Sequence, residues 1–128
     1  HLVFTGVTRN SRKILKSVTN NLHKVKPLLD TVDMAHDSII SNNSDEFFGI
    51  MSEGWNQKKQ TSFAITENTK IKEIDRALEK NSTVLAHKLC GAGNGGFFLT
   101  FSKKDALTTA FDSVKINVTA DGVLGRIV

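Results

Sequence analysis

VLAHKLCGAGNGGFFLTF, residues 84–101, contains two apolar runs separated by a glycine-rich segment. The first run, residues 84–89, is rich in aliphatic and β-branched side chains and predicts a strand. The second run, residues 97–101, alternates, with Phe97, Leu99 and Phe101 on one face, and predicts another strand. We therefore expect a strand pair, in which the glycines exceed what chain reversal requires.

The glycine-rich segment, residues 91–96, can provide bare backbone amides. Glycine adopts positive φ without steric cost and lets another group approach the backbone. Successive N–H groups can then form a concave anion site, where each bond to a charged oxygen contributes about 1.5–3 kcal/mol. We predict that the loop binds phosphate or a phosphorylated ligand through Gly91, Ala92, Gly93, Asn94, Gly95 and Gly96. The alternative is a flexible or tightly packed hairpin.

The same letters match the dinucleotide-binding pattern G-x-G-x-x-G through Gly91, Gly93 and Gly96. That pattern requires a helix directly after the loop, because the helix N-terminus binds the pyrophosphate. A strand pattern, FFLTF, follows instead. The sequence therefore argues against a dinucleotide fold.

Three stretches resemble motifs of the GHMP small-molecule kinases. KLCGAGNGGF at residues 88–97 resembles their third motif, K-L-x-G-A-G-x-G-G-F. FTGVTR at residues 4–9 and WNQKK at residues 55–59 are similar to the Y-T-G-x-x-R strand end and the W-x-x-K-K helix of the sugar-1-kinase branch, which includes heptose 7-phosphate kinases. Cys90 and Asn94 depart from the usual third motif, but neither change removes a backbone N–H.

The resemblance implies that residues 1–128 are a single domain, the C-terminal part of a two-domain kinase whose N-terminal domain is its partner. The parent enzyme would use ATP and Mg to phosphorylate a sugar or sugar phosphate, at the anomeric hydroxyl. The family's ATP loop and catalytic Asp, where used, belong to the N-terminal domain. We therefore expect no catalytic residue and no activity in this chain alone. The alternative, from a different class, is a stand-alone ferredoxin-like module that binds a small anion without catalysis.

Five side chains are further candidates. Lys88 precedes the loop and could offer charge to a phosphate, although an exposed strand lysine is the plainer interpretation. Arg9 could clamp a phosphate in bidentate fashion or be a solvated loop residue. The resemblance suggests that Trp55, Lys58 and Lys59 face sugar or phosphate, and the alternative is a buried Trp beside a solvated lysine pair.

The sequence indicates neither a metal site nor a reactive cysteine. His23, His36 and His87 lack metal-ligand spacing and have no evident carboxylate partner, so we expect no metal site. The single cysteine, Cys90, has no evident base and is expected to be a buried structural thiol.

The composition, with 39% hydrophobic and 23% charged residues, is typical of a globular protein. The net charge is +4 and the pI about 9.3, but the cations are spread along the chain, which argues against nucleic acid as a partner. No stretch is long and apolar enough to cross a membrane, and we expect a cytoplasmic protein. The chain begins at His1 directly before a strand pattern, and we expect it to be a fragment.

The predicted elements run strand, several helices, strand, strand, helix, strand. Strands are expected at residues 2–5, 84–89, 97–101, 114–118 and 123–128. A short helix or ordered loop over residues 9–18 is expected, then helices from Pro27 to Ile40, from an N-cap at Ser44, over residues 71–81 and over residues 102–111. We therefore predict an α+β fold, a ferredoxin-like antiparallel sheet with helices on one face and extra helices in the first crossover. The C-terminal domain of the GHMP kinases has the same layout.

Overall fold

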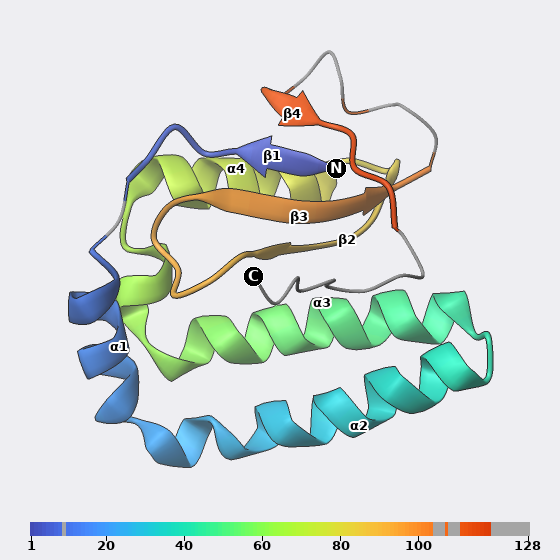
Figure 1. Cartoon of the computed structure of the whole chain (residues 1–128). Helices are drawn as coiled ribbons and strands as arrows, with labels where there is room; N and C mark the ends of the chain where they lie inside the picture. The colour runs from blue at the N-terminus through green and yellow to red at the C-terminus, as the bar shows by residue number, and fades with distance from the viewer. Residues whose placement is uncertain (9, 104–106, 108–110, 119–128) are drawn as a thin grey trace, which may run out of the picture.

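The computed structural model of the chain describes residues 1–8, 10–103, 107 and 111–118 (Figure 1). Its strands are β1 (Leu2–Phe4), β2 (Val84–Leu89), β3 (Phe97–Ser102) and β4 (Ser113–Val114). Between β1 and β2 lie the helices α1 (Ser11–Thr19), α2 (Lys26–Ile40), α3 (Ser44–Thr61) and α4 (Thr69–Lys80), with two 3₁₀ turns, η1 (Leu22–Lys24) and η2 (Phe63–Thr66).

The strands form one sheet in the order β2-β3-β1-β4, and every neighbouring pair is antiparallel. Phe98 of β3 is opposite Val3 of β1 on one side and Leu89 of β2 on the other. Because strand side chains alternate between faces, this register brings all three side chains to the same face. All three are buried, and the predicted α+β class with an antiparallel sheet is confirmed.

Helix α4 packs on this buried face, behind the sheet in Figure 1. Its apolar stripe, Ile71 and Leu78, is fully buried, and Asn68 caps its N-terminus by accepting a hydrogen bond from the Lys70 N–H. The helix predicted from the spacing of these apolar residues is therefore confirmed.

Helix α3 lies alongside β2, and α2 packs antiparallel against α3 (Figure 1). The Trp55 ring of α3 meets Phe98 edge-on with centroids 5.9 Å apart, and the Phe48 ring lies 5.4 Å from that of Phe101. Strand β2 is an edge of the sheet, and a helix laid beside it blocks pairing with another chain.

The start of α3 differs from the prediction by one residue. The N-cap is Asn43, not Ser44: its Oδ1 accepts from the Glu46 N–H, and its Nδ2 donates to the Glu46 carboxylate at 2.9 Å. Only the first of these bonds is that of a capping box, because the Asn43 backbone N–H donates to the Ser38 carbonyl and Glu46 instead accepts from the Asn43 side chain. Ser44 is the first helical residue.

The opposite face of the sheet carries Phe4, Phe97, Leu99 and Phe101. Phe4 and Phe97 are 43% and 42% exposed, and their rings lie 5.0 Å apart. Within the described ranges, no helix lies in front of this face in Figure 1. The described helices therefore cover one face and the β2 edge, where Phe48 of α3 also contacts Phe101, and they leave Phe4 and Phe97 of the other face exposed.

The C-terminal part differs most from expectation. A strand was predicted over residues 114–118, but β4 contains only Ser113 and Val114, and residues 115–118 form no strand. The predicted strand at residues 123–128 and most of the predicted helix at 102–111 lie outside the described residues. Leu107 is described and is fully buried in the core cluster.

Replacing Asn43 with Ala is expected to lower the free energy of unfolding by about 1 kcal/mol, because the first turn of α3 loses its cap. Ser44→Ala is the matched control and is expected to change it by less than about 0.5 kcal/mol. Urea unfolding followed by circular dichroism measures both, and an equal loss in the two variants would contradict the assignment of the cap.

Candidate functional site: the glycine loop and its support

The second half of the glycine loop is held by the chain around it. The Asn94 N–H donates to the Ile65 carbonyl at 2.6 Å, and the Gly96 N–H donates to the Val7 carbonyl at 3.0 Å. The Asn94 side chain accepts from the Asn68 N–H at 2.8 Å, just ahead of α4. These amides serve the fold and are not available to a ligand.

Gly93 lies at the boundary of the packed half. It is buried with φ +109°, and a Cβ there would approach Ile65 Cγ2 to 2.9 Å and Ile65 Cα to 3.0 Å. Only glycine fits both the backbone conformation and the close approach of η2. Part of the glycine content is therefore explained by packing, as the plainer interpretation of the sequence anticipated.

The first half of the loop, residues 91–93, differs from the second in the hydrogen bonding of its amides. Gly91 is exposed and Ala92 half-buried. Within the described part of the chain, the N–H groups of Gly91, Ala92 and Gly93 donate to no acceptor. Gly91 and Gly93 both have positive φ, at +72° and +109°. Consecutive unpaired amides in such a backbone are a physical basis for anion binding, now restricted to residues 91–93.

Lys58 of α3 reaches the start of this open half. Its Nζ donates to the Gly91 carbonyl at 2.6 Å and to the Leu89 carbonyl at 3.3 Å. A positive charge is therefore placed beside the open amides. The fixed ammonium adds to the potential that would attract an anion there.

A buried carboxylate holds α3 in this position. Asp75 of α4 accepts from Trp55 Nε1 at 2.7 Å and from Lys59 Nζ at 3.0 Å, and His87 Nε2 of β2 lies 2.8 Å from the same carboxylate. We call Trp55, Lys59, Asp75 and His87 the Asp75 cluster. It joins α3, α4 and β2.

The cluster keeps Asp75 ionised. Burial by itself would raise the pKa of the Asp75 carboxyl, but hydrogen bonds from His87, Trp55 and Lys59, together with the charge of Lys59, bring it below the ordinary value of 3.8. An ionised carboxylate only accepts hydrogen bonds, so His87 Nε2 is the donor in its contact with Asp75.

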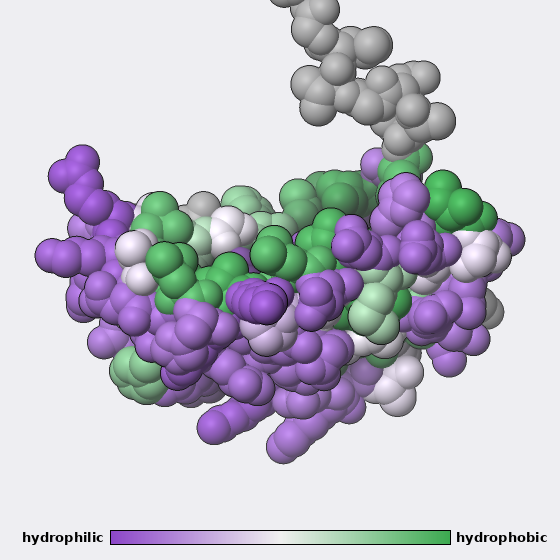
Figure 2. Space-filling view, turned by 90° about the horizontal axis from the view of Figure 1, so that it is seen from below, coloured by the Kyte–Doolittle hydropathy of each residue, from purple (hydrophilic) through white to green (hydrophobic). Residues whose placement is uncertain are grey.

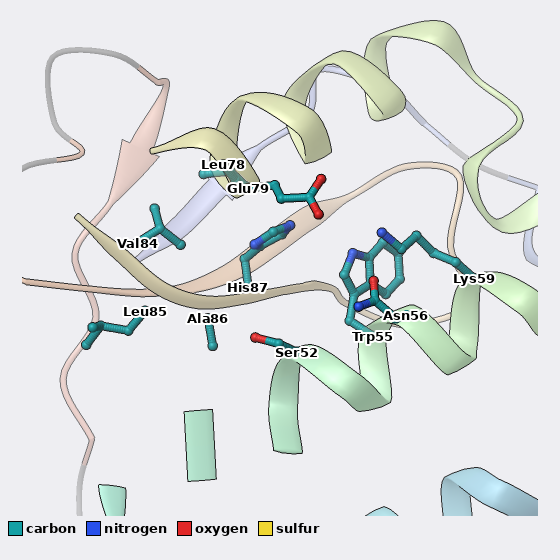
Figure 3. A pocket seen from close by; sticks show the side chains of 10 residues that line it. All are labelled: Ser52, Trp55, Asn56, Lys59, Leu78, Glu79, Val84, Leu85, Ala86 and His87. Atoms are coloured by element: carbon teal, nitrogen blue, oxygen red, sulfur yellow. The ribbon is translucent and has the colours of Figure 1, made fainter. Parts of the chain in front are cut away.

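A cavity of about 130 Å³ adjoins the cluster between α3, α4 and β2 (Figure 3). Figure 3 shows Ser52 and Asn56 entering it from α3, Glu79 from α4 and His87 from β2. This volume is small beside the usual 300–1,000 Å³ of ligand sites. We therefore assign the cluster a positioning role.

The structure brings most of the predicted residues together. Lys58 contacts the loop directly, whereas Lys59 faces away from it, onto Asp75. The expected buried Trp is confirmed, since Trp55 is 2% exposed, but the expectation of a solvated lysine pair is wrong. Lys88 is exposed on β2, which agrees with the alternative of an exposed strand lysine. Arg9 lies outside the described residues.

Asp75 was missed, and so was its contact with His87, for which the sequence predicted no carboxylate partner. A signal was present in α4. Asp75 is four residues after Ile71 and three before Leu78, which puts a charged residue on the apolar stripe. A carboxylate on a buried face needs partners, and the spacing alone could have indicated this.

No group of three or more His, Cys, Asp and Glu side chains that could bind a metal occurs in the described ranges. In the same ranges, the helices are too short or too polar to cross a membrane. The chain matches no known family description and no curated protein sequence. The functional conclusion therefore depends on the geometry above and on the motifs in the sequence.

Gly93→Ala is expected to lower the free energy of unfolding by about 2–3 kcal/mol, because the new methyl group would meet Ile65 and the backbone would be strained at positive φ. Gly49→Ala in α3 is the control: its new Cβ meets nothing within 4 Å, and it is expected to stabilise by up to about 1 kcal/mol. Urea titration distinguishes the two, and a fully stable Gly93→Ala protein would refute the packing of the loop on η2.

Asp75→Asn is expected to lower the free energy of unfolding by about 3 kcal/mol at pH 7, because Lys59 and His87 lose a buried charged acceptor. The folded pKa of Asp75 is depressed, so its stabilisation is present above the unfolded value of 3.8 and is lost as the pH falls through the folded value. The difference between wild type and variant should therefore shrink below about pH 4. Exposed Asp33→Asn is the control, and a difference that does not change with pH would contradict this account.

Proposed function

We propose that this chain is the C-terminal domain of an ATP-dependent small-molecule kinase of the GHMP type, in which the open half of the glycine loop binds phosphate. The single observation that carries the proposal is the set of Gly91, Ala92 and Gly93 amides without an acceptor in the described chain, beside the Lys58 ammonium. Backbone N–H groups and a lysine are the donors that phosphate sites use.

The order of the strands supports the ferredoxin-like plan. Since β3 is antiparallel to both β1 and β2, those two strands run parallel with β3 between them. Since β1 is antiparallel to both β3 and β4, these also run parallel with β1 between them. The pair β1 and β2, with β3 between them and a long helical crossover, has the split β-α-β arrangement. Most of the connection between β3 and β4 lies outside the described residues, so the support from the second pair is the order and direction of its strands.

In this proposal, the residues of this chain would bind and orient a phosphate group. The three open amides and Lys58 would fix a phosphate of the nucleotide or of the substrate, and Lys88 would add charge from the neighbouring strand. When bound, Mg-ATP supplies the phosphoryl group and neutralises its charge. The described residues fit an anion, and the family resemblance implies that the metal, the nucleotide loop and any catalytic base would belong to the N-terminal domain of the parent enzyme.

The test is a coupled assay of ATP turnover against sugars and sugar phosphates, with the protein that joins this chain to the domain before it. Lys58→Met is expected to lower kcat/KM by about a hundredfold, in line with the loss of one electrostatic donor. Lys80→Met, at the exposed end of α4, is the matched control and should retain activity. Residues 1–128 alone should turn over no ATP. Turnover by residues 1–128, or an unaffected Lys58→Met enzyme, would refute the proposal.

A stand-alone anion-binding module remains the second candidate, because the open amides by themselves support phosphate binding without catalysis. The two candidates differ in the protein that contains the chain. A preceding domain with a Gly/Ser-rich phosphate loop supports the kinase, and phosphate binding without any phosphoryl transfer in the complete protein supports the module.

A further inference from the structure

A groove of about 580 Å³ lies between α2 and α3, separate from the loop amides. Its volume falls within the range of small-molecule sites. Most residues that line it are apolar, and two of them, Ile50 and Trp55, are buried. The other apolar residues that line it are Leu28, Val32, Ala35, Ile39, Phe47 and Met51.

Among the described residues that line the groove, the permanently charged side chains are cations. Lys58 and Lys88 line it where α3 meets β2, and no described lining residue is a carboxylate. A second crevice between the same two helices, which includes Asp30 and Glu53, is lined by two carboxylates and no cation. The two crevices therefore differ in charge, although they share their helices.

Local sequence keeps the groove apolar and accessible. Gly54 lines it opposite Thr31, and a Cβ at Gly54 would meet the Thr31 hydroxyl at 3.5 Å, an ordinary van der Waals contact, so α2 and α3 lie close together here. Val32 and Ile39 are 63% and 61% exposed. In Figure 2, which views the molecule from below, apolar side chains gather in a band above a largely hydrophilic surface.

We propose that the groove binds a small amphipathic anion, with its apolar part between α2 and α3 and its anionic group at Lys58 and Lys88. Apolar lining selects an apolar body, and the two lysines at one end fix its direction. Lys58 also contacts Gly91, so the anionic group lies next to the glycine loop. This inference goes beyond the kinase proposal and stands whether or not phosphate binds the loop.

Decanoate is the probe, because it combines a flexible apolar chain with one carboxylate. Trp55 is the only tryptophan and lines the groove, so its fluorescence reports occupancy. We expect a saturable change with one decanoate bound per chain, binding about tenfold weaker for decyltrimethylammonium, and no saturable change with acetate.

Two variant pairs locate the probe. Ala35→Phe fills the groove and is expected to weaken decanoate binding at least about tenfold, whereas Met34→Phe, in the acidic crevice, leaves it unchanged. Lys88→Met is expected to weaken binding about threefold to fivefold, and Lys80→Met to leave it unchanged. Circular dichroism confirms that each variant is folded.

Equal affinity for decanoate and decyltrimethylammonium would overturn the proposal, since it would indicate a merely apolar surface. So would unchanged binding in both Ala35→Phe and Lys88→Met, or no saturable binding at all. Failure of the kinase assay would leave these results unaffected, because they need neither ATP nor the loop amides.

Discussion

The carboxylate of Asp75 is the constraint on which the rest of the structure depends. It is buried, and a buried charge is tolerated only when its hydrogen bonds are made. Its three partners come from two other elements, Trp55 and Lys59 of α3 and His87 of β2. Satisfying one side chain of α4 therefore fixes the separation and rotation of α3 beside the sheet.

The position of α3 has consequences on both of its sides. Towards the sheet, Lys58 follows Trp55 by less than one turn and meets the Gly91 carbonyl, so the cluster and the loop are connected through one helix. Towards solvent, α3 provides one wall of the groove whose other wall is α2. The phosphate site and the amphipathic groove that we propose thus share α3 and the cations Lys58 and Lys88, and they differ in their other partners, backbone amides in the loop and apolar side chains in the groove.

Local patterns in the sequence predicted much of the fold. Alternation in β3, apolar spacing in α4 and Pro27 at the start of α2 are signals carried by near neighbours, and each identified its element. The Asp75 cluster joins residues 12–20 positions apart, so no local window contained it. The division of the glycine loop was equally hidden, because the acceptors for Asn94 and Gly96 are carbonyls of Ile65 and Val7. The motif indicated which residues form the loop but not which amides the fold already uses.

The central claim is that one half of the glycine loop is structural and the other half meets an anion. A titration of the ¹⁵N-labelled chain with pyrophosphate, followed by two-dimensional amide NMR, tests this residue by residue. The account predicts saturable shifts at Gly91, Ala92 and Gly93 that exceed those at Asn94 and Gly96, whose N–H groups are bonded to the chain. No saturable shift in the loop, or shifts of equal size in both halves, would contradict it.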